Sequence, residues 1–306
     1  MSAAWTRQIQ LADLTPTLLP VRPVFNTGRR TVITIVFWNL GASSDTMSHL
    51  LCLAKTHDVD ILLLAEYSPA KIAASVEALT ALGVGSYRAE QSAPAKVLAL
   101  TRLAREDFVH QFTSLGKEMA IWKLRAPKLQ SREALLVGVH LPSKAGGNNE
   151  TDQASVAMEV IKELASIEDE HNHRNTALVG DFNMQPYDPG MTMVTGFHGL
   201  MTRALAELPD RVHRTQARRR FYNPMWGLFG DRTPGPAGSY YWHSSVLHNT
   251  HWEMLDQVLL RSPLANHLVD LRVLDNDGNH TLVGRDGGPE KHHLSDHLPV
   301  LFQLDI

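Results

Sequence analysis

The sequence lacks several features that would assign it to a specialised class. Its 306 residues contain one cysteine, Cys52, so the chain cannot form an internal disulfide. No apolar run is long enough to cross a membrane, and no G-x-S-x-G motif marks a serine nucleophile. The formal charge is only −3, so no strong overall field attracts nucleic acid or an anionic membrane, although a local basic patch is compatible with it.

The first 30 residues show no regular hydrophobic pattern, and Pro16, Pro20 and Pro23 interrupt them. We expect an irregular N-terminal extension at 1–30, followed by a single domain over 31–306. The N-terminus has no basic head followed by an apolar core, so we expect no signal peptide. Together with the single cysteine, this predicts a soluble cytoplasmic protein of unspecified oligomeric state.

Apolar, β-branched runs alternate with amphipathic segments along the remainder of the chain. Several runs follow one another without a helix between them, and 119–124 and 134–140 are expected to be antiparallel neighbours. The pattern therefore predicts an α/β (α+β) protein with mixed sheets and external helices. The expected strands are 31–38, 59–65, 97–102, 119–124, 134–140, 176–180, 255–260 and 298–304, and the expected helices begin near 45, 69 and 151.

Polar residues stand where these apolar runs begin or end. Because strand ends of an α/β scaffold converge on one edge, side chains far apart in sequence are expected to meet there. The set is Asn39, Glu66, His140, Asp181, Asn183, Asp256, Asp296 and His297.

Carboxylate and amide oxygens suit a hard cation such as Mg²⁺ or Mn²⁺, which neutralises phosphate oxygens and a leaving alkoxide. A histidine held by a carboxylate can act as a general base or polarise a phosphate near neutral pH. An aspartate can orient or deprotonate water, and an asparagine can hold a phosphate oxygen without adding charge. The set therefore indicates hydrolysis of a phosphate ester by water, without a covalent intermediate.

Six segments occur in an order that resembles the endonuclease/exonuclease/phosphatase superfamily, the DNase I-like proteins. The two specific pieces are GDFN at 180–183 and SDH at 295–297, and the resemblance spans about residues 31–306. It implies a four-layer sandwich in which two mixed sheets pack face to face with helices outside. The six segments are FWNLG, LLLAEY, VGVHLPSK, VGDFNMQP, LDQVLL and LSDHLPV.

The resemblance also implies a role for each residue at the strand ends. Glu66 matches the metal-binding glutamate of the family, and Asn39 and Asp296 match residues close to the metal. His140 matches a histidine that contacts the scissile phosphate. The remaining roles are water activation for Asp181, phosphate binding for Asn183, and catalysis for His297 with Asp256 as its carboxylate partner; whether Asp181 or His297 takes the proton stays open.

Taken singly, each of these residues has an ordinary structural explanation. An Asp or Asn after a strand is usually part of a turn, and a single histidine is usually a satisfied interior residue. The order of the six segments is what favours the catalytic interpretation.

The segment Arg218–Arg220 precedes Phe221, Tyr222 and Trp226, and two interpretations of it remain open. Guanidinium groups and Tyr222 beside other aromatic side chains fit a strand of nucleic acid, so Arg218, Arg219, Arg220 and Tyr222 are candidate substrate-binding residues. A solvated basic turn followed by an aromatic anchor in the core explains the same pattern.

The sequence therefore predicts a metal-dependent nuclease or phosphodiesterase, with nucleic acid as the expected substrate. A phosphatase or phosphodiesterase for a small molecule or lipid headgroup is the enzymatic alternative. A silent binding module is a remote alternative, because silent relatives usually lose a metal acid or a catalytic histidine, and Glu66, Asp181, Asp296 and His297 are all present.

Overall fold

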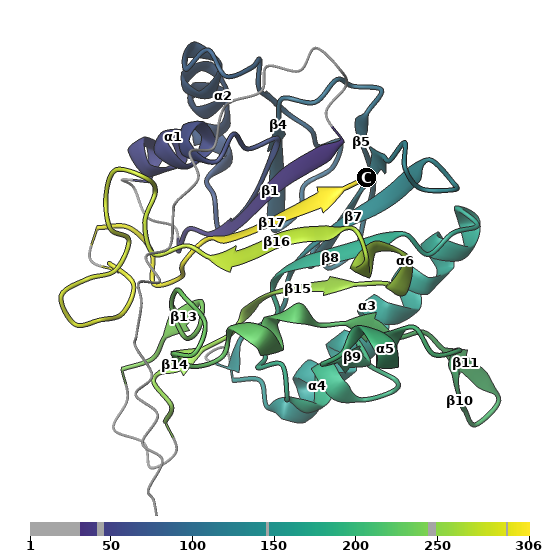
Figure 1. Cartoon of the computed structure of the whole chain (residues 1–306). Helices are drawn as coiled ribbons and strands as arrows, with labels where there is room; N and C mark the ends of the chain where they lie inside the picture. The colour runs from purple at the N-terminus through teal and green to yellow at the C-terminus, as the bar shows by residue number, and fades with distance from the viewer. Residues whose placement is uncertain (1–30, 42–45, 145–146, 244–248, 292) are drawn as a thin grey trace, which may run out of the picture. The chain divides into compact units, whose positions relative to one another are not determined.

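Two mixed β-sheets form the centre of the computed structural model of this chain (Figure 1). The structure describes residues 31–41, 46–144, 147–243, 249–291 and 293–306, so the extension predicted at 1–30 lies outside the described residues. Thr31 to Ile306 group into one compact unit.

The first sheet has six strands in the order β16-β17-β1-β2-β4-β3. Its central strand β1 runs parallel to β2 and antiparallel to β17. The strands are β1 (Val32–Asn39), β2 (Ile61–Ala65), β3 (Arg88–Ala89), β4 (Val97–Thr101), β16 (Leu268–Val273) and β17 (Val300–Asp305).

The second sheet has seven strands in the order β5-β6-β7-β8-β15-β12-β9. The antiparallel pairing predicted for 119–124 and 134–140 is confirmed, and β7 pairs in parallel with β8. The strands are β5 (Phe108–Thr113), β6 (Met119–Arg125), β7 (Glu133–His140), β8 (Thr176–Asp181), β9 (Gly199–Leu200), β12 (Phe221–Tyr222) and β15 (Asp256–Leu260); two further hairpins are β10 (Arg211–His213) with β11 (Gln216–Arg218), and β13 (Tyr240–Tyr241) with β14 (Trp252–Glu253).

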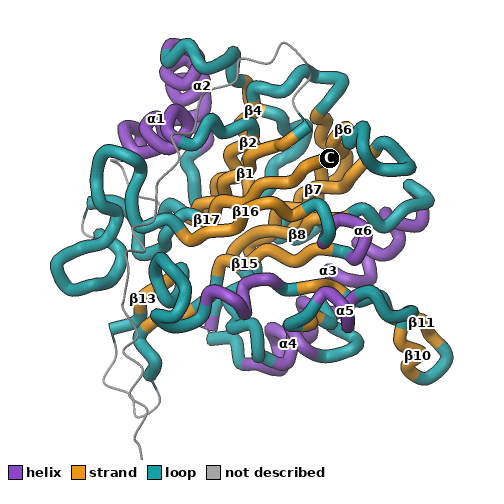
Figure 2. The backbone as a smooth tube through the Cα atoms, viewed as in Figure 1, coloured by secondary structure: helices purple, strands orange, loops and turns teal. Residues whose placement is uncertain are grey.

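Helices lie on both sides of the two sheets, with α1 and α2 on one side and α3, α4 and α5 on the other (Figure 2). The longest, α3, begins one residue earlier than its sequence pattern predicted, because Asn149 caps it and forms a capping box with Asp152. No helix in the described ranges is long and apolar enough to span a membrane. The helices are α1 (Met47–Thr56), η1 (Pro69–Lys71), α2 (Ile72–Ala81), α3 (Glu150–Glu170), α4 (Pro189–Thr192), α5 (Arg203–Ala206), η3 (Pro224–Leu228) and α6 (Ser262–Ala265).

The two faces of β7 bury different cores, because successive side chains of a strand point to opposite faces. Leu136 belongs to the cluster between the sheets, which also contains Phe37 of β1 and Val179 of β8. Leu135 and Val137 belong to the cluster beneath α3. The order of helix, sheet, sheet and helix confirms the four-layer sandwich.

Candidate active site

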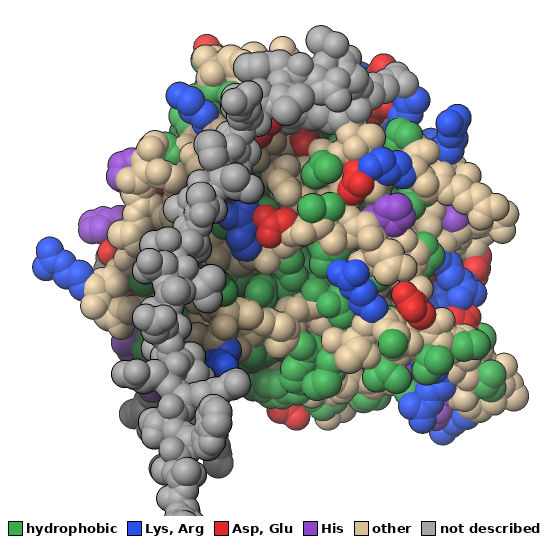
Figure 3. All heavy atoms as spheres, viewed as in Figure 1, with side chains coloured by type: hydrophobic (Ala, Val, Ile, Leu, Met, Phe, Trp, Pro, Cys, Tyr) green, Lys and Arg blue, Asp and Glu red, His purple; other side chains and the backbone are tan. Residues whose placement is uncertain are grey.

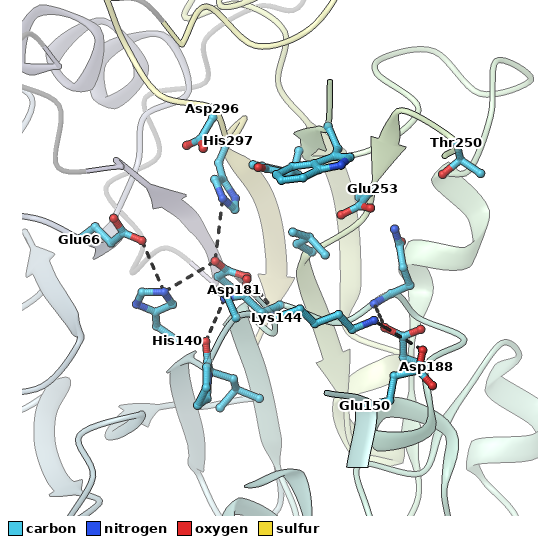
Figure 4. A pocket seen from close by; sticks show the side chains of 18 of the residues that line it. Glu66, His140, Lys144, Glu150, Asp181, Asp188, Thr250, Glu253, Asp296 and His297 are labelled. Atoms are coloured by element: carbon cyan, nitrogen blue, oxygen red, sulfur yellow. Dashed lines mark hydrogen bonds and ion pairs between the residues drawn. The ribbon is translucent and has the colours of Figure 1, made fainter. Parts of the chain in front are cut away.

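The register of the strands brings the predicted site residues to one edge of the sandwich (Figure 4). His140, at the end of β7, stands opposite Asp181, at the end of β8. Asp256, at the start of the antiparallel strand β15, pairs with Asp181 from the other side. In the first sheet, Asn39 at the end of β1 stands opposite Ala65, the residue before Glu66.

The end of the chain adds the last two residues. The strand β17 is antiparallel to β1, with Val300 opposite Phe37, so the segment before β17 returns to the edge where β1 ends. Two hydrogen bonds fix that segment: Trp38 Nε1 donates to the carbonyl of His297 at 2.9 Å, and Ser295 Oγ donates to the carbonyl of Asn39 at 2.7 Å. Asp296 is thereby held beside Gly41, where an added Cβ would lie 3.1 Å from its Oδ1.

A buried chain of three ionisable groups forms the centre of the site. The Nδ1 atom of His297 lies 2.7 Å from Asp256 Oδ2, and its Nε2 atom lies 4.0 Å from Asp181 Oδ2. All three side chains are buried, and one ligand atom from each of them lies within 4.8 Å of the other two. The short contact with Asp256 orients the imidazole of His297.

Burial and electrostatic interactions strongly shift the pKa values of Asp181 and His297. Burial raises the pKa of Asp181 to about 7, although the neighbouring His297 acts in the opposite direction. Burial alone would lower the pKa of His297, but the carboxylates of Asp256, Asp181 and Asp296 raise it to about 10. Near neutral pH the site therefore holds a protonated imidazole beside a carboxyl group poised close to its own pKa.

A second group of donors lies on the other side of Asp181. Asn39 Nδ2 lies 3.0 Å from Asp181 Oδ2 and 3.3 Å from Glu66 Oε1. His140 Nε2 lies 3.6 Å from Glu66 Oε1 and 3.8 Å from Asp181 Oδ2, and burial lowers the pKa of His140. The amide nitrogen of Asn39 thus contacts both carboxylates, while its Oδ1 accepts the backbone N–H of Gly41 at 3.1 Å. The carboxylate oxygens of Glu66 and Asp181 are therefore close together and are of the type that Mg²⁺ or Mn²⁺ prefers.

Asn183 supports the site through its backbone as well as its side chain. It has a positive φ of 51°, a conformation that asparagine tolerates, and its N–H donates to Asp181 Oδ1 at 2.8 Å. Its Nδ2 donates one hydrogen to the carbonyl of Leu141 at 2.9 Å, which orients the amide at the pocket wall.

These residues open into a pocket of about 1260 Å³, whose walls come from loops and from the β13–β14 hairpin, which carries Tyr240 and Glu253. Sequence reasoning did not assign Lys96, Lys144 and Glu253 to it. Tyr240 lies against the His297 ring at a centroid distance of 4.8 Å and stacks on Trp242 at 6.3 Å. The aromatic run at 239–242 was the only sequence signal for this wall, and it is equally typical of core packing.

Arg218, Arg219, Arg220 and Tyr222, the predicted substrate-binding residues, do not line this pocket. Tyr222 pairs with Leu260, at the opposite end of β15 from Asp256, and the β10–β11 hairpin carries its basic side chains on that far side (Figures 1 and 3). Arg219 forms ion pairs with Glu168, at 2.7 Å, and with Asp169. Arg220 donates to the carbonyl of Leu208, and Arg218 to the side chain of Gln216.

No family model and no curated protein matches this sequence. Solved structures do match it over almost their whole length. The endonuclease domain of TRAS1, a telomere-specific non-LTR retrotransposon, is 13% identical with a TM-score of 0.52, over 90% of this chain and 99% of that one. ANGEL2, a 2′,3′-cyclic phosphatase solved in complex with adenosine-2′,3′-vanadate, is 14% identical with a TM-score of 0.54, over 90% and 96%.

A third structure, D. rerio TDP2 complexed with a single-strand DNA product, is 11% identical with a TM-score of 0.51, over 89% of this chain and 98% of that one. Likeness at these identities shows the fold alone. The chain thus shares the fold of these three proteins, which agrees with the four-layer sandwich that the motif resemblance implied.

Proposed function

We propose that the protein is a divalent-metal-dependent hydrolase of phosphate esters, acting as a phosphodiesterase or nuclease through in-line attack by water. One observation supports this most: the pair His297–Asp256, joined at 2.7 Å, lies beside Asp181, and Asn39 links Asp181 to Glu66 by donating to both carboxylates. These groups come from both sheets, and packing alone does not require them to meet.

Glu66, Asp296 and Asn39 are the residues that would hold Mg²⁺ or Mn²⁺, which supplies charge neutralisation at the phosphate when it is bound. Asp181 would take the proton of the attacking water, because its pKa of about 7 allows it to accept a proton near neutral pH. His297, with a pKa of about 10, would donate hydrogen bonds to the phosphate. His140 and Asn183 would hold further phosphate oxygens.

A nucleotide or nucleic-acid end is the first substrate class we infer. Tyr240 and Trp242 form an aromatic wall beside His297, and a base can stack on such a wall whatever its identity. Lys96 and Lys144 line the same pocket and can approach a phosphate backbone. The basic segment at 218–220 lies outside this pocket, and its role in substrate binding stays a prediction.

A small phosphate ester is the second candidate, because one wall of the pocket is acidic. Lys144 lies 3.5 Å from Asp188 and 3.7 Å from Glu150, and Glu253 lines the same wall (Figure 4). This arrangement disfavours a long polyanion there and suits a compact headgroup. The single cysteine favours a reducing compartment, so we place the enzyme in the cytoplasm.

A substrate panel tests the proposal. Single- and double-stranded DNA, RNA, bis-p-nitrophenyl phosphate and a soluble phosphomonoester are incubated with Mg²⁺, with Mn²⁺ or with chelator. The test variant is Asp181→Asn, and the control is Asp270→Asn, because Asp270 pairs with Arg272 at 2.9 Å and does not line the pocket. Chelator-sensitive cleavage that Asp181→Asn loses and Asp270→Asn keeps is expected; activity that survives both chelator and Asp181→Asn would refute it.

A further inference from the structure

A second cluster of metal-type donors lies outside the pocket. His49 on α1 and the loop after β16 meet at Asp277: His49 Nδ1 is 2.7 Å and His280 Nδ1 is 3.4 Å from Asp277 Oδ2. One ligand atom from each of the three side chains lies within 4.8 Å of the others. None of these residues lines the pocket of the proposed active site.

The carboxylate at the centre is fixed in place by its own loop. Asp277 is fully buried, and its Oδ1 accepts the backbone N–H groups of Asn279 and His280, each at 2.7 Å. Its Oδ2 is therefore directed at the two imidazoles. The loop also sits tightly on α1, because a Cβ added at Gly278 would lie 2.2 Å from Thr56 Oγ1. An ion here would meet a preorganised donor set.

Cys52 lies next to this cluster but does not belong to it. It follows His49 by three residues on α1, and its Sγ accepts from Nδ2 of Asn279, the residue before His280, at 3.1 Å. Its sulfur is not among the ligand atoms that lie within 4.8 Å of one another, so the candidate donor set has three members.

We propose that His49, Asp277 and His280 form a transition-metal site, with Zn²⁺ as the preferred ion. Two imidazoles and a carboxylate match the three-ligand zinc sets that leave the fourth position to water or another ligand. At metal–ligand distances near 2.1 Å, tetrahedral nitrogen and oxygen donors lie roughly 3.4 Å apart. The His280–Asp277 separation already has this value, and the His49–Asp277 hydrogen bond would lengthen by about 0.7 Å as the metal replaces its proton.

The site would link two segments that are each connected to residues of the proposed active site. The first helix begins shortly after Asn39, and the loop at 274–283 lies on the path from β16 to Asp296 and His297 (Figure 1). A bound ion would therefore fasten the segment that carries the catalytic histidine to the segment that follows β1. This inference does not depend on the proposed function.

Zn²⁺ and Co²⁺ titration of the full chain tests the site. His280→Ala is the main variant, because its side chain is 61% exposed and its loss should not endanger folding. His243→Ala is the matched control, since His243 pairs with Asp286 at 2.9 Å as an ordinary exposed pair. The variant Asp181→Asn distinguishes Zn²⁺ binding at this site from Zn²⁺ binding at the proposed catalytic site.

The wild-type chain, His243→Ala and Asp181→Asn are expected to bind Zn²⁺ at this site, and His280→Ala to bind it at least about 10-fold more weakly. Co²⁺ bound at this site is expected to give a tetrahedral spectrum that His280→Ala weakens. Equal Zn²⁺ binding by wild type and His280→Ala, or no binding by wild type, would overturn the three-donor site.

Discussion

Replacing Glu168 by glutamine is expected to destabilise the protein strongly, although Glu168 lies far from the pocket. Its carboxylate is 1% exposed and accepts hydrogen bonds from Thr176 at 2.7 Å and from Arg219 at 2.7 Å. It also binds Arg261, which is 2% exposed, at 2.9 Å and 3.1 Å. A glutamine at this position removes the charge and turns an N–H₂ group toward guanidinium donors.

The size of the effect follows from the burial of both partners. Removing one charge of a buried, hydrogen-bonded pair costs about 3–5 kcal/mol, because the other charge is left uncompensated. For a chain of this size, each kcal/mol lowers Tm by about 2–4 °C, so the expected loss is about 6–20 °C.

The same pair gives the stability a pH dependence. Burial alone would raise the pKa of Glu168, but Arg261 and Arg219 lower it below the ordinary value of 4.5. A lowered folded-state pKa means that the stabilisation is present above the unfolded pKa and is lost as pH falls through the folded pKa. The difference between wild type and Glu168→Gln is therefore expected at pH 7 and should shrink below about pH 4.

Urea unfolding followed by circular dichroism measures both effects. The matched control is Glu159→Gln, an exposed glutamate of the same helix, for which a change below about 0.5 kcal/mol is expected. A loss below about 1 kcal/mol in Glu168→Gln at pH 7, or a loss as large at pH 3.5 as at pH 7, would refute the reasoning.

Three further substitutions probe the site and its scaffold. Asp256→Asn should lower kcat on bis-p-nitrophenyl phosphate about 10²–10⁴-fold, because His297 loses its orienting carboxylate; an unchanged kcat would exclude that pair from catalysis. Arg219→Ala should lower Tm and leave kcat/KM unchanged in the same preparation. An unchanged Tm with a lower kcat/KM would instead support its predicted role in substrate binding. Gly180→Ala should cost more than about 3 kcal/mol in thermal or urea unfolding, because its Cβ would lie 1.9 Å from the carbonyl of Val139; a near-native Tm would show that β7 and β8 can separate.

Most of the scaffold could be predicted because its strands are buried on both faces. Such strands have uninterrupted apolar runs, as in β2 and β8, whose predicted ranges 59–65 and 176–180 differ from the observed strands by one or two residues at one end. β5 and β16 were not predicted, because FVHQFT and LVDLRV mix charged or polar residues with apolar ones. Both end strands are only partly buried, so their pattern is weak.

The residues at the strand ends were predictable for a different reason. Each is tied by the chain to a recognisable strand, so the register of the sheets brings it to the pocket. Arg219 could not be placed in this way, because its position depends on Glu168, about fifty residues earlier on another element. The pocket walls around Tyr240 and Lys144 depend on loop conformation, which hydrophobic periodicity does not describe.

The acids of the pocket floor explain why protons and a cation would compete there. Glu66, Asp181, Asp256 and Asp296 lie close together, and the repulsion among them is relieved when Asp181 or His297 carries a proton. A divalent cation held by Glu66 and Asp296 would relieve the same repulsion, so it would lower the pKa of both groups and release protons. The pKa of about 7 at Asp181 thus describes a site without a cation, and a bound cation would extend the pH range in which Asp181 is an effective base.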